Sequence, residues 1–361
     1  MSFDPQKPYN DLPLLPPKKD IETRAILKKT ITAGRALAEL KGLGKTIPDQ
    51  SMLVNSVVLQ EAKASSEIEN IITTNDALFR AFTAKTSRVD PSTKEVLRYR
   101  EALWEGYNEL KKRPILATNL FVKLVQRIKE NQAGIRRTPG TTISNAATGE
   151  VIYTPPEGEA VIRDKLKNLE VYIHGEDDID PLIKLALIHY QFEIIHPFSD
   201  GNGRTGRIIN ILYLVFRGLL DLPVLYLSKF IIDRKNDYYR LLRRVTEKGE
   251  WEPWILYMLD AVEETATFTR KRILDIRVLM NETMEVAKET LPGKVYSKEL
   301  IELLFCQPYT KGQFLVDAGI AKRKTAAEYL KALEKTGILT GKRIGREMLY
   351  LNTRLYDLLS K

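Results

Sequence analysis

Residues 196–207 read HPFSDGNGRTGR and lie between two apolar segments, residues 182–195 and 208–216. The segment before the loop is apolar on most of its sides, which predicts a buried central helix. The segment after it predicts a second helix. Gly201 and Gly203 free the backbone between the two helices to approach a ligand. This stretch therefore predicts a mainly helical core that holds a polar, glycine-rich loop.

The charges in this loop predict an anion site. Arg204 and Arg207 lie on one side of the first turn of the second helix. Cations at a helix N-terminus oppose the helix dipole, at a cost of about 0.3–1 kcal/mol each, so we expect an anion to compensate them. Free backbone amides at this helix end also favour phosphate. Asp200 is an oxygen ligand suited to Mg²⁺, and His196 is the candidate general base.

The glycines also match a second pattern. Gly201, Gly203 and Gly206 have the spacing of the dinucleotide-binding fingerprint, and Asp221 lies about 20 residues further on. That fingerprint follows a strand in a βαβ unit, whereas helical sequence precedes this loop and Pro197 would lie inside the strand. We therefore disfavour a Rossmann site.

The string from His196 to Arg207 resembles the signature of the Fic family, His-x-Phe-x-Asp/Glu-Gly-Asn-Gly-Arg-x-x-Arg, without a gap. The resemblance implies a Fic-type helical bundle that moves AMP from ATP to a hydroxyl side chain of a target protein or of itself. It implies that His196 is catalytic, that Asp200 holds Mg²⁺ and that Phe198 anchors the loop. The residues that it assigns to the nucleotide are Gly201, Asn202, Gly203, Arg204, Thr205, Gly206 and Arg207.

Residues 134–158 are rich in Thr, Ser, Gly and Pro around short apolar segments, which predicts a β-hairpin. Within it, residues 137–144 resemble the Fic flap, which would line the nucleotide and pair edge-on with a target segment. A surface hairpin without contacts is the alternative. Tyr239 lies in a region that resembles the closure of the adenine pocket, although such aromatics are equally often core residues. The flap residues expected at the nucleotide are Thr141, Thr142, Ile143 and Ser144.

An inhibitory segment is expected upstream of the core. Residues 65–70 read SSEIEN and resemble the family's inhibitory helix motif, Ser/Thr-x-x-x-Glu-Gly/Asn. Ser65 and Glu69 share a helix face, so the hydroxyl can steady the carboxylate. Glu69 could then pair with Arg207 and displace the γ-phosphate. A solvated acidic helix end is the alternative, and the same carboxylate could instead align water for removing AMP from a modified target.

The chain of 361 residues is 43% hydrophobic and 29% charged, which is typical of a globular protein with more than one domain. No segment approaches the roughly 18 apolar residues of a membrane span, and the first 17 residues lack a signal peptide's apolar run. We expect a cytoplasmic protein without membrane contact, and a homodimer because relatives often form one. Three parts are expected: a regulatory helical region at 1–95, a Fic-like core at 96–290 and a winged helix at 291–361.

The basic character belongs mostly to the C-terminal part. Residues 293–361 carry 13 basic and 7 acidic residues, so they supply +6 of the net charge of +9. Three short helical segments and an alternating segment at 342–351 predict a winged helix. Cations gather at the start of the third helix and on the wing, at Lys322, Arg323, Lys324, Lys342, Arg343 and Arg346.

Such a domain binds DNA or docks a protein, and the sequence leaves both open. The second hypothesis for the whole chain is therefore a DNA-binding regulator whose Fic-like core senses nucleotide.

Helices are further expected at about residues 20–41, 51–68 and 92–111. Of the remaining histidines, His189 is expected in the core and His174 on the surface. Cys306 lies in an apolar stretch and is expected to be core. With three His and one Cys in the chain, no zinc site is expected.

Overall fold

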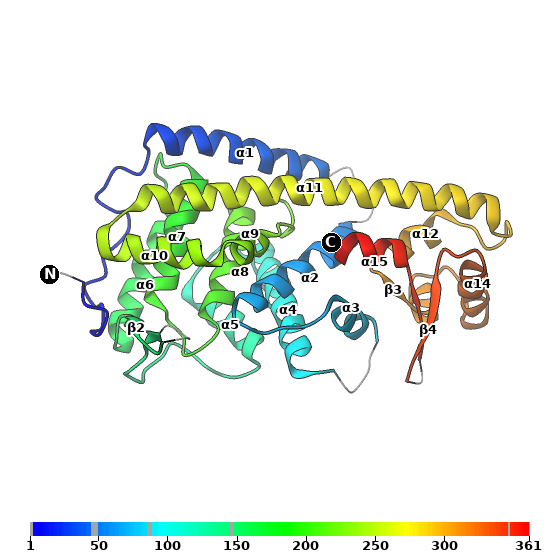
Figure 1. The fold of residues 1–361 in the computed structure, drawn as a ribbon, viewed down its shortest axis with the longest axis horizontal. Coiled ribbons are helices and arrows are strands. Elements are labelled where there is room, and N and C mark those ends of the chain that lie inside the picture. Colours follow the sequence, from blue (N-terminus) through cyan, green and yellow to red (C-terminus); the bar gives the residue numbers. More distant parts are fainter. Residues whose placement is uncertain (1–2, 45–49, 85–88, 145–147, 346, 361) are drawn as a thin grey trace.

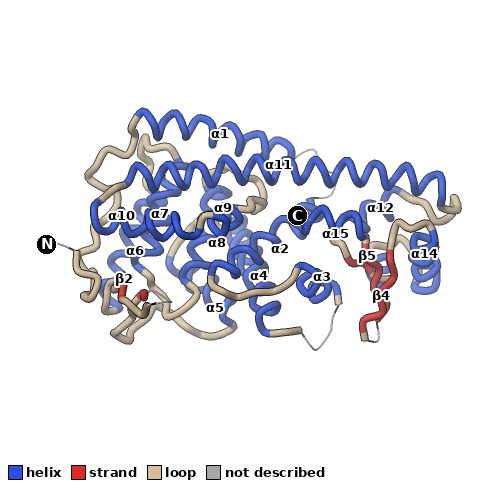
Figure 2. The backbone as a smooth tube through the Cα atoms, in the orientation of Figure 1, coloured by secondary structure: helices blue, strands red, loops and turns tan. Residues whose placement is uncertain are grey.

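The computed structural model describes residues 3–44, 50–84, 89–144, 148–345 and 347–360 (Figure 1). Most of these residues are helical, and the strands are short (Figure 2). The helices up to the end of the core are α1 (Arg24–Gly44), α2 (Gln50–Ile68), α3 (Asn75–Thr83), α4 (Pro91–Lys112), α5 (Thr118–Lys129), α6 (Glu159–His174), α7 (Pro181–Ile195), α8 (Asn202–Phe216), α9 (Leu227–Asp233), α10 (Lys235–Lys248) and α11 (Trp251–Thr290).

Helix α7 is the buried centre of the core. Thirteen of its fifteen residues are buried, as its apolar sequence predicts. The helix begins at Pro181, where Asp180 accepts a hydrogen bond from the Leu182 amide at 2.8 Å, and it ends at His196. Helices α6, α8 and α11 pack against it. Because α7 is enclosed, the loop that leaves its C-terminus starts from a fixed position.

Helices α1 and α11 lie side by side along one edge of the molecule and run in the same direction (Figure 1). Ion pairs join them at both ends of the contact, from Lys29 to Glu263 at 2.8 Å and from Arg270 to Glu39 at 2.7 Å. Helix α11 is 40 residues long and continues past α1 into the C-terminal part. It therefore connects the core to the C-terminal domain without a flexible linker.

The C-terminal part contains α12 (Lys298–Phe305), β3 (Tyr309–Thr310), α13 (Gly312–Asp317), α14 (Arg323–Lys335), β4 (Thr340–Ile344), β5 (Glu347–Leu351) and α15 (Thr353–Ser360). Its strands form an antiparallel sheet in the order β3-β5-β4. Three helices and a hairpin are the arrangement expected for a winged helix, and the prediction of a mainly helical protein with this C-terminal domain is confirmed.

The C-terminal domain is docked on the core. The Tyr309 hydroxyl donates to Asp76 of α3 at 2.5 Å, and Phe79 of α3 meets Tyr356 of α15 edge to face at 6.1 Å between ring centres. Helix α15 also packs on α11. The domain thus shares a packed interface with the first helices of the chain.

Some expectations need correction. His174 is half-buried rather than on the surface, because its ring nitrogen lies 3.0 Å from the Leu116 carbonyl and its ring meets Phe216 edge-on. Cys306 packs against the core but is partly exposed at the end of α12. His189 is buried as predicted. No helix in the described ranges is both long and apolar enough to cross a membrane.

Candidate active site

The loop at residues 196–201 joins α7 to α8, whose first turns contain the rest of the motif, and it is held from the flap side. His196 has a positive φ of 49° and caps α7. Arg136 Nε donates to the His196 carbonyl at 2.8 Å, and the Tyr153 hydroxyl donates to the Ile194 carbonyl at 2.9 Å. These donors satisfy the last carbonyls of α7, which have no partner inside the helix. Arg136 and Tyr153 therefore fix the position of His196.

Asn202 shapes the loop from within. Its side-chain oxygen accepts from the Phe198 amide at 2.8 Å, and its side-chain nitrogen donates to the Phe198 carbonyl at 2.7 Å. Phe198 is buried against Phe192 of α7, so the loop is anchored in the core. Gly201 adopts a left-handed φ of 85° just before α8 begins. Both polar atoms of Asn202 are thus used to close the turn that presents the first amides of α8.

The His196 ring is buried next to a backbone carbonyl. Its Nδ1 lies 3.3 Å from the Glu193 carbonyl, which can only accept a hydrogen bond, so the proton is assigned to Nδ1 and Nε2 is left as the basic nitrogen. Burial of the ring lowers the pKa of His196 to about 4. The imidazole is therefore neutral at pH 7.

Arg207 is buried and paired with the upstream segment. Its Nη2 lies 2.7 Å from Glu69 Oε1, and Arg207 is 1% exposed whereas the Glu69 side chain is 34% exposed. Burial alone would raise the pKa of Glu69, but the charge of Arg207 outweighs it and lowers that pKa below its usual value. The structure thus brings Glu69 and Arg207 together as an ionised pair.

The hydroxyl of Ser65 has a partner that the sequence did not suggest. It accepts a hydrogen bond from Arg207 Nε at 2.7 Å, and the Ser65 carbonyl accepts from Arg207 Nη2 at 2.8 Å. The prediction that this hydroxyl steadies the Glu69 carboxylate is wrong in this structure, because it steadies the guanidinium instead. Arg207 is therefore contacted by Ser65 in the last turn of α2 and by Glu69 directly after this helix.

The Glu69 carboxylate lies directly over the start of α8. A β-carbon added at Gly203 would lie 2.3 Å from Glu69 Oε1, far inside van der Waals contact. The glycine at this position is what allows the carboxylate so close to the helix N-terminus. An anion is favoured there by the helix dipole, and Glu69 supplies that negative charge.

Arg204 and Asp200 belong to a charged cluster that also contains two residues not foreseen from the sequence. Arg204 is 1% exposed and donates to Glu95 of α4 at 2.6 Å. Lys129 of α5 lies 2.8 Å from the same carboxylate and 2.6 Å from Asp200. Asp200 is 62% exposed, so its carboxylate lies at the mouth of the site.

The carboxylate at the mouth of the site suits a metal ion that is also bound by phosphate. No group of three or more His, Cys, Asp or Glu able to hold an ion is found among the described residues. A single exposed carboxylate such as Asp200 suits Mg²⁺, which is usually bound by one or two carboxylates together with phosphates and waters.

The other expected nucleotide residues are spread around the loop. Thr205 is buried, and Gly206 lies against α7, where an added β-carbon would be 2.4 Å from Glu193 Oε1. Tyr239 is 46% exposed and meets Tyr238 edge-on at 5.1 Å. Thr205 and Gly206 therefore serve the packing of α8, whereas Tyr239 presents an accessible ring.

The flap is a short hairpin of β1 (Ile143–Ser144) and β2 (Val151–Tyr153), with Ile143 opposite Tyr153. Thr142 and Ser144 are exposed, whereas Thr141 and Ile143 are half-buried. The segment before the hairpin borders a groove of about 630 Å³ that includes Thr141. Ser199 of the glycine-rich loop lines the same groove, so the groove leads to the site.

The mainly helical core, the hairpin and the glycine-rich loop together define a Fic fold. Three family models match the chain: the Fic/DOC family N-terminal region over residues 27–108, the Fic/DOC family over residues 91–214, and the C-terminal domain of SoFic-like protein adenylyltransferases over residues 279–355. The chain therefore contains regions of the Fic/DOC family over residues 27–214 and a SoFic-like C-terminal domain over residues 279–355.

Curated relatives match over part of the chain. Protein adenylyltransferase fic-1 of Caenorhabditis elegans is 32% identical over 108 residues, which are 29% of this chain and 20% of that protein. A probable protein adenylyltransferase of Aquifex aeolicus is 37% identical over 79 residues, 22% of this chain and 24% of that protein. The match thus spans about a fifth to a quarter of these relatives.

Solved structures share the fold over a longer span. A Fic family protein from Desulfovibrio desulfuricans covers 93% of this chain and 98% of its own, with a TM-score of 0.56 at 20% identity. Fic-1 from C. elegans covers 71% of this chain and 74% of its own, with a TM-score of 0.53 at 18% identity. At this level of identity the likeness concerns the fold.

Proposed function

We propose that this protein is an adenylyltransferase that moves AMP from ATP to a Ser, Thr or Tyr hydroxyl of a target protein or of itself. The observation that carries the proposal is the buried Arg207 at the N-terminus of α8, which pairs with the Glu69 carboxylate, together with the neutral His196 at the start of the same loop. The matching family models and the names of the relatives support the same reaction.

His196 performs the proton transfer in this proposal. Its basic Nε2 takes the proton of the hydroxyl while the hydroxyl oxygen bonds to the α-phosphorus. The bond from the α-phosphorus to the bridging oxygen breaks, and pyrophosphate leaves. The neutral state of the ring supports this role, because a protonated imidazole cannot act as a base.

The start of α8 holds the triphosphate. Gly201 and Gly203 leave the loop backbone open to the phosphates, and Arg207 offers a guanidinium to the terminal phosphate once Glu69 withdraws. Asp200 would hold Mg²⁺, which neutralises phosphate charge when it is bound. Lys129 must then release its ion pair with Asp200 or share that carboxylate.

The target segment is expected beside the flap. The groove bordered by Thr141 and Ser199 leads from the hairpin to the glycine-rich loop. An extended segment paired with the flap edge would bring one hydroxyl to His196.

Transfer is tested by incubating the purified protein with ATP labelled in its α-phosphate and Mg²⁺, and by comparing Glu69→Gly with the double variant Glu69→Gly/His196→Ala. The account expects labelled protein only when His196 is present, with a loss of about 10²-fold or more without it. Equal labelling of the two variants would show that His196 is not the base.

We further propose that Glu69 inhibits the enzyme by occupying the place of the terminal phosphate. Its contact with Arg207 and its position over Gly203 support this proposal. The same carboxylate could align water for AMP removal, and loss of label from a modified target on addition of wild type, but not of Glu69→Gly, would identify that reverse activity.

A DNA-binding regulator is the second candidate, because Lys322, Arg323 and Lys324 are exposed at the start of α14. Lys342 and Arg343 of β4 are exposed as well, and Arg346 lies outside the described residues. Salt-dependent mobility shift of a random duplex, lost when the three α14 cations are replaced by Ala, would support this function. His196→Ala separates the two functions. A DNA-binding regulator would keep its DNA binding in this variant, whereas an adenylyltransferase would lose AMP transfer.

The organisation of the whole protein remains part of the proposal. We propose a regulatory region at 1–95, a catalytic core at 96–290 and a winged helix at 291–361, in a cytoplasmic homodimer. Light scattering on the full chain tests the dimer, and a single monomeric mass at micromolar concentration would contradict it.

A further inference from the structure

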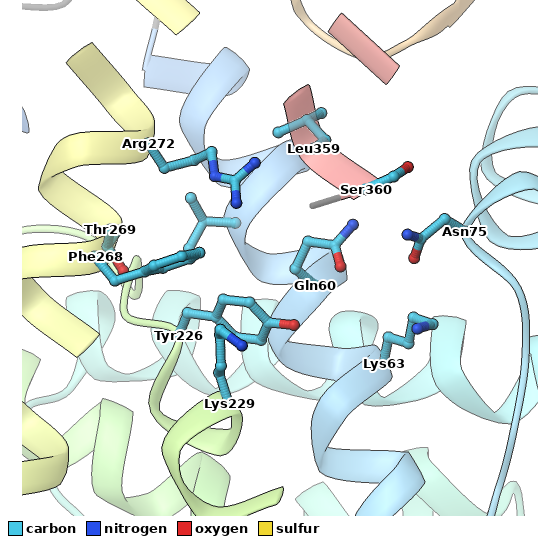
Figure 3. A pocket seen from close by; sticks show the side chains of 11 residues that line it. Gln60, Lys63, Asn75, Tyr226, Lys229, Phe268, Thr269, Arg272, Leu359 and Ser360 are labelled. Atoms are coloured by element: carbon cyan, nitrogen blue, oxygen red, sulfur yellow. The ribbon is translucent and has the colours of Figure 1, made fainter. Parts of the chain in front are cut away.

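A second polar pocket lies outside the glycine-rich loop, where α2, α11 and α15 come together (Figure 3). We call it the junction pocket. It has a volume of about 100 Å³, and its walls also include Asn75 of α3 and Lys229 of α9. The pocket therefore lies between the core and the last helix of the C-terminal domain.

The charge of the junction pocket is positive. Lys63, Lys229 and Arg272 line it, and none of the described residues that line it is acidic. Lys229 Nζ and the Arg272 guanidinium carbon lie 5.6 and 5.0 Å from the centre of the same Phe268 ring. Two cations that share one ring repel each other unless an anion lies near them.

The two lysines have other partners, whereas part of Arg272 has none. Lys63 lies 3.8 Å from Glu67, and Lys229 lies 3.0 Å from Asp233, each on its own helix. Nη1 of Arg272 is buried without a hydrogen-bond partner among the described residues. Burial also lowers the pKa of this guanidinium below its usual value. The pocket thus contains a half-buried guanidinium that has Asp275 as a nearby charge but whose Nη1 has no hydrogen-bond partner among the described residues.

Neutral polar atoms in the same pocket are unpartnered as well. Within the described chain, Gln60 Nε2, Asn75 Oδ1 and Thr269 Oγ1 have no hydrogen-bond partner. Gln60 is 8% exposed and Thr269 is 1% exposed. Figure 3 shows that Gln60, Asn75 and Arg272 project toward one common space. Each such group destabilises the fold if it is left unsatisfied, so a ligand that bonds to several of them is favoured.

We propose that the junction pocket binds a phosphate-sized oxyanion, either free inorganic phosphate or the phosphoryl group of a small monoester. Gln60 Nε2 and Arg272 Nη1 supply donors, and the hydroxyl of Thr269 can donate a third hydrogen bond. A tetrahedral anion accepts hydrogen bonds from several directions, as this arrangement requires. A volume of about 100 Å³ admits such an anion but not a whole nucleotide.

The bound anion would join three elements. Gln60 and Lys63 lie on α2, Thr269 and Arg272 on α11, and Ser360 on α15. A ligand that binds the folded arrangement alone raises its stability, so thermal unfolding reports on the site independently of AMP transfer.

Titration calorimetry of the full chain in phosphate-free buffer tests the proposal, with inorganic phosphate and O-phosphoserine as probes. Arg272→Gln is expected to weaken phosphate binding about tenfold or more and to abolish the phosphate-induced rise in Tm. The matched control is Arg277→Gln, an exposed arginine on the same helix, which should bind within about twofold of wild type. Binding of both probes indicates that the pocket accepts a monoester, and binding of phosphate alone indicates the free ion.

Arg272 also packs on Phe268, so a second variant separates binding from folding. Thr269→Val keeps the shape of the side chain and removes the unpartnered hydroxyl, so it should weaken phosphate binding severalfold without lowering Tm in phosphate-free buffer. Equal phosphate affinity in wild type, Arg272→Gln and Thr269→Val would overturn the proposal. So would a crystal grown in phosphate that shows only ordered water in the pocket.

Discussion

At the scale of single residues, burial has opposite effects on the charge states of two site residues. Arg207 is buried with a carboxylate partner, so it stays charged, whereas His196 is buried with only a carbonyl partner and stays neutral. The same cost of burying charge therefore leaves one side chain charged and the other neutral, as the proposed roles in phosphate binding and proton transfer require.

The neutral His196 predicts an unusual pH profile for AMP transfer. Burial disfavours the imidazolium, so the pKa falls from 6.5 to about 4 and the base is lost only as the pH falls toward that value. With Mg²⁺ in excess, kcat/KM of Glu69→Gly should change less than about twofold between pH 7.5 and 5.5. An ordinary histidine would lose about nine tenths of its basic form over that range, and a fall of that size would contradict the account.

Glu193 predicts a pH-dependent stability. Burial raises its pKa to about 7, although Arg207 opposes the shift. A raised folded-state pKa stabilises the protein below the unfolded pKa, and this contribution is lost as the pH rises through 7. The free energy of unfolding of Glu193→Gln minus that of wild type should therefore increase by about 1–3 kcal/mol from pH 5 to pH 8. Urea unfolding at both pH values checks this, and a difference that does not vary with pH would refute it.

At this scale the sequence predicted the site residues that lie together in one motif and missed the site residues that lie far from it in the chain. His196, Asp200 and Arg207 are in one motif, so their types and spacing were informative. Arg136 contacts the loop from 60 positions away, and nothing in its neighbourhood distinguishes it from other surface arginines. The charged cluster around Glu95 was missed for the same reason.

At the scale of elements, the position of α2 decides whether Glu69 reaches Arg207. Glu61 fixes this helix from within the core. Its carboxylate accepts from the Ser228 amide at 2.8 Å, from the Ser228 hydroxyl at 2.5 Å and from the Tyr99 hydroxyl at 3.0 Å. Helix α2 is thereby tied to α9 and α4.

Removal of this carboxylate should be costly, because it leaves buried donors without an acceptor. We predict that Glu61→Ala lowers the free energy of unfolding by about 2–4 kcal/mol. Glu67→Ala, on the same helix but 42% exposed, should change it by about 0.5 kcal/mol or less. Urea unfolding measures both, and equal effects would show that Glu61 does not anchor α2.

Helical periodicity predicted the bounds of α2 and α4 to within about two residues. It did not predict α3 or α15. Both helices are short and are stabilised by tertiary contacts, such as that between Phe79 of α3 and Tyr356 of α15. The junction pocket was equally out of reach, since its residues come from several elements.

At the scale of the whole molecule, α11 and the docked C-terminal domain should make unfolding cooperative. Phe79 is 1% exposed at the contact with α15. Phe79→Ala should lower the free energy of unfolding by about 3–5 kcal/mol and lower the Tm of one common calorimetric transition. Two separate transitions, of which only one responds to the substitution, would show that the domains unfold independently.

The proposed inhibition joins all three scales: we propose that Glu69, directly after α2, holds Arg207 until ATP replaces the carboxylate. The most direct measurement is the initial rate of AMP incorporation from labelled ATP by wild type, Glu69→Gly and the control Glu67→Gly, which removes a neighbouring charge from the same helix turn. The account predicts a rate at least about tenfold above wild type for Glu69→Gly and a rate near wild type for Glu67→Gly, because Glu69 pairs with Arg207 whereas Glu67 pairs with Lys63. Equal rates for wild type and Glu69→Gly would contradict it.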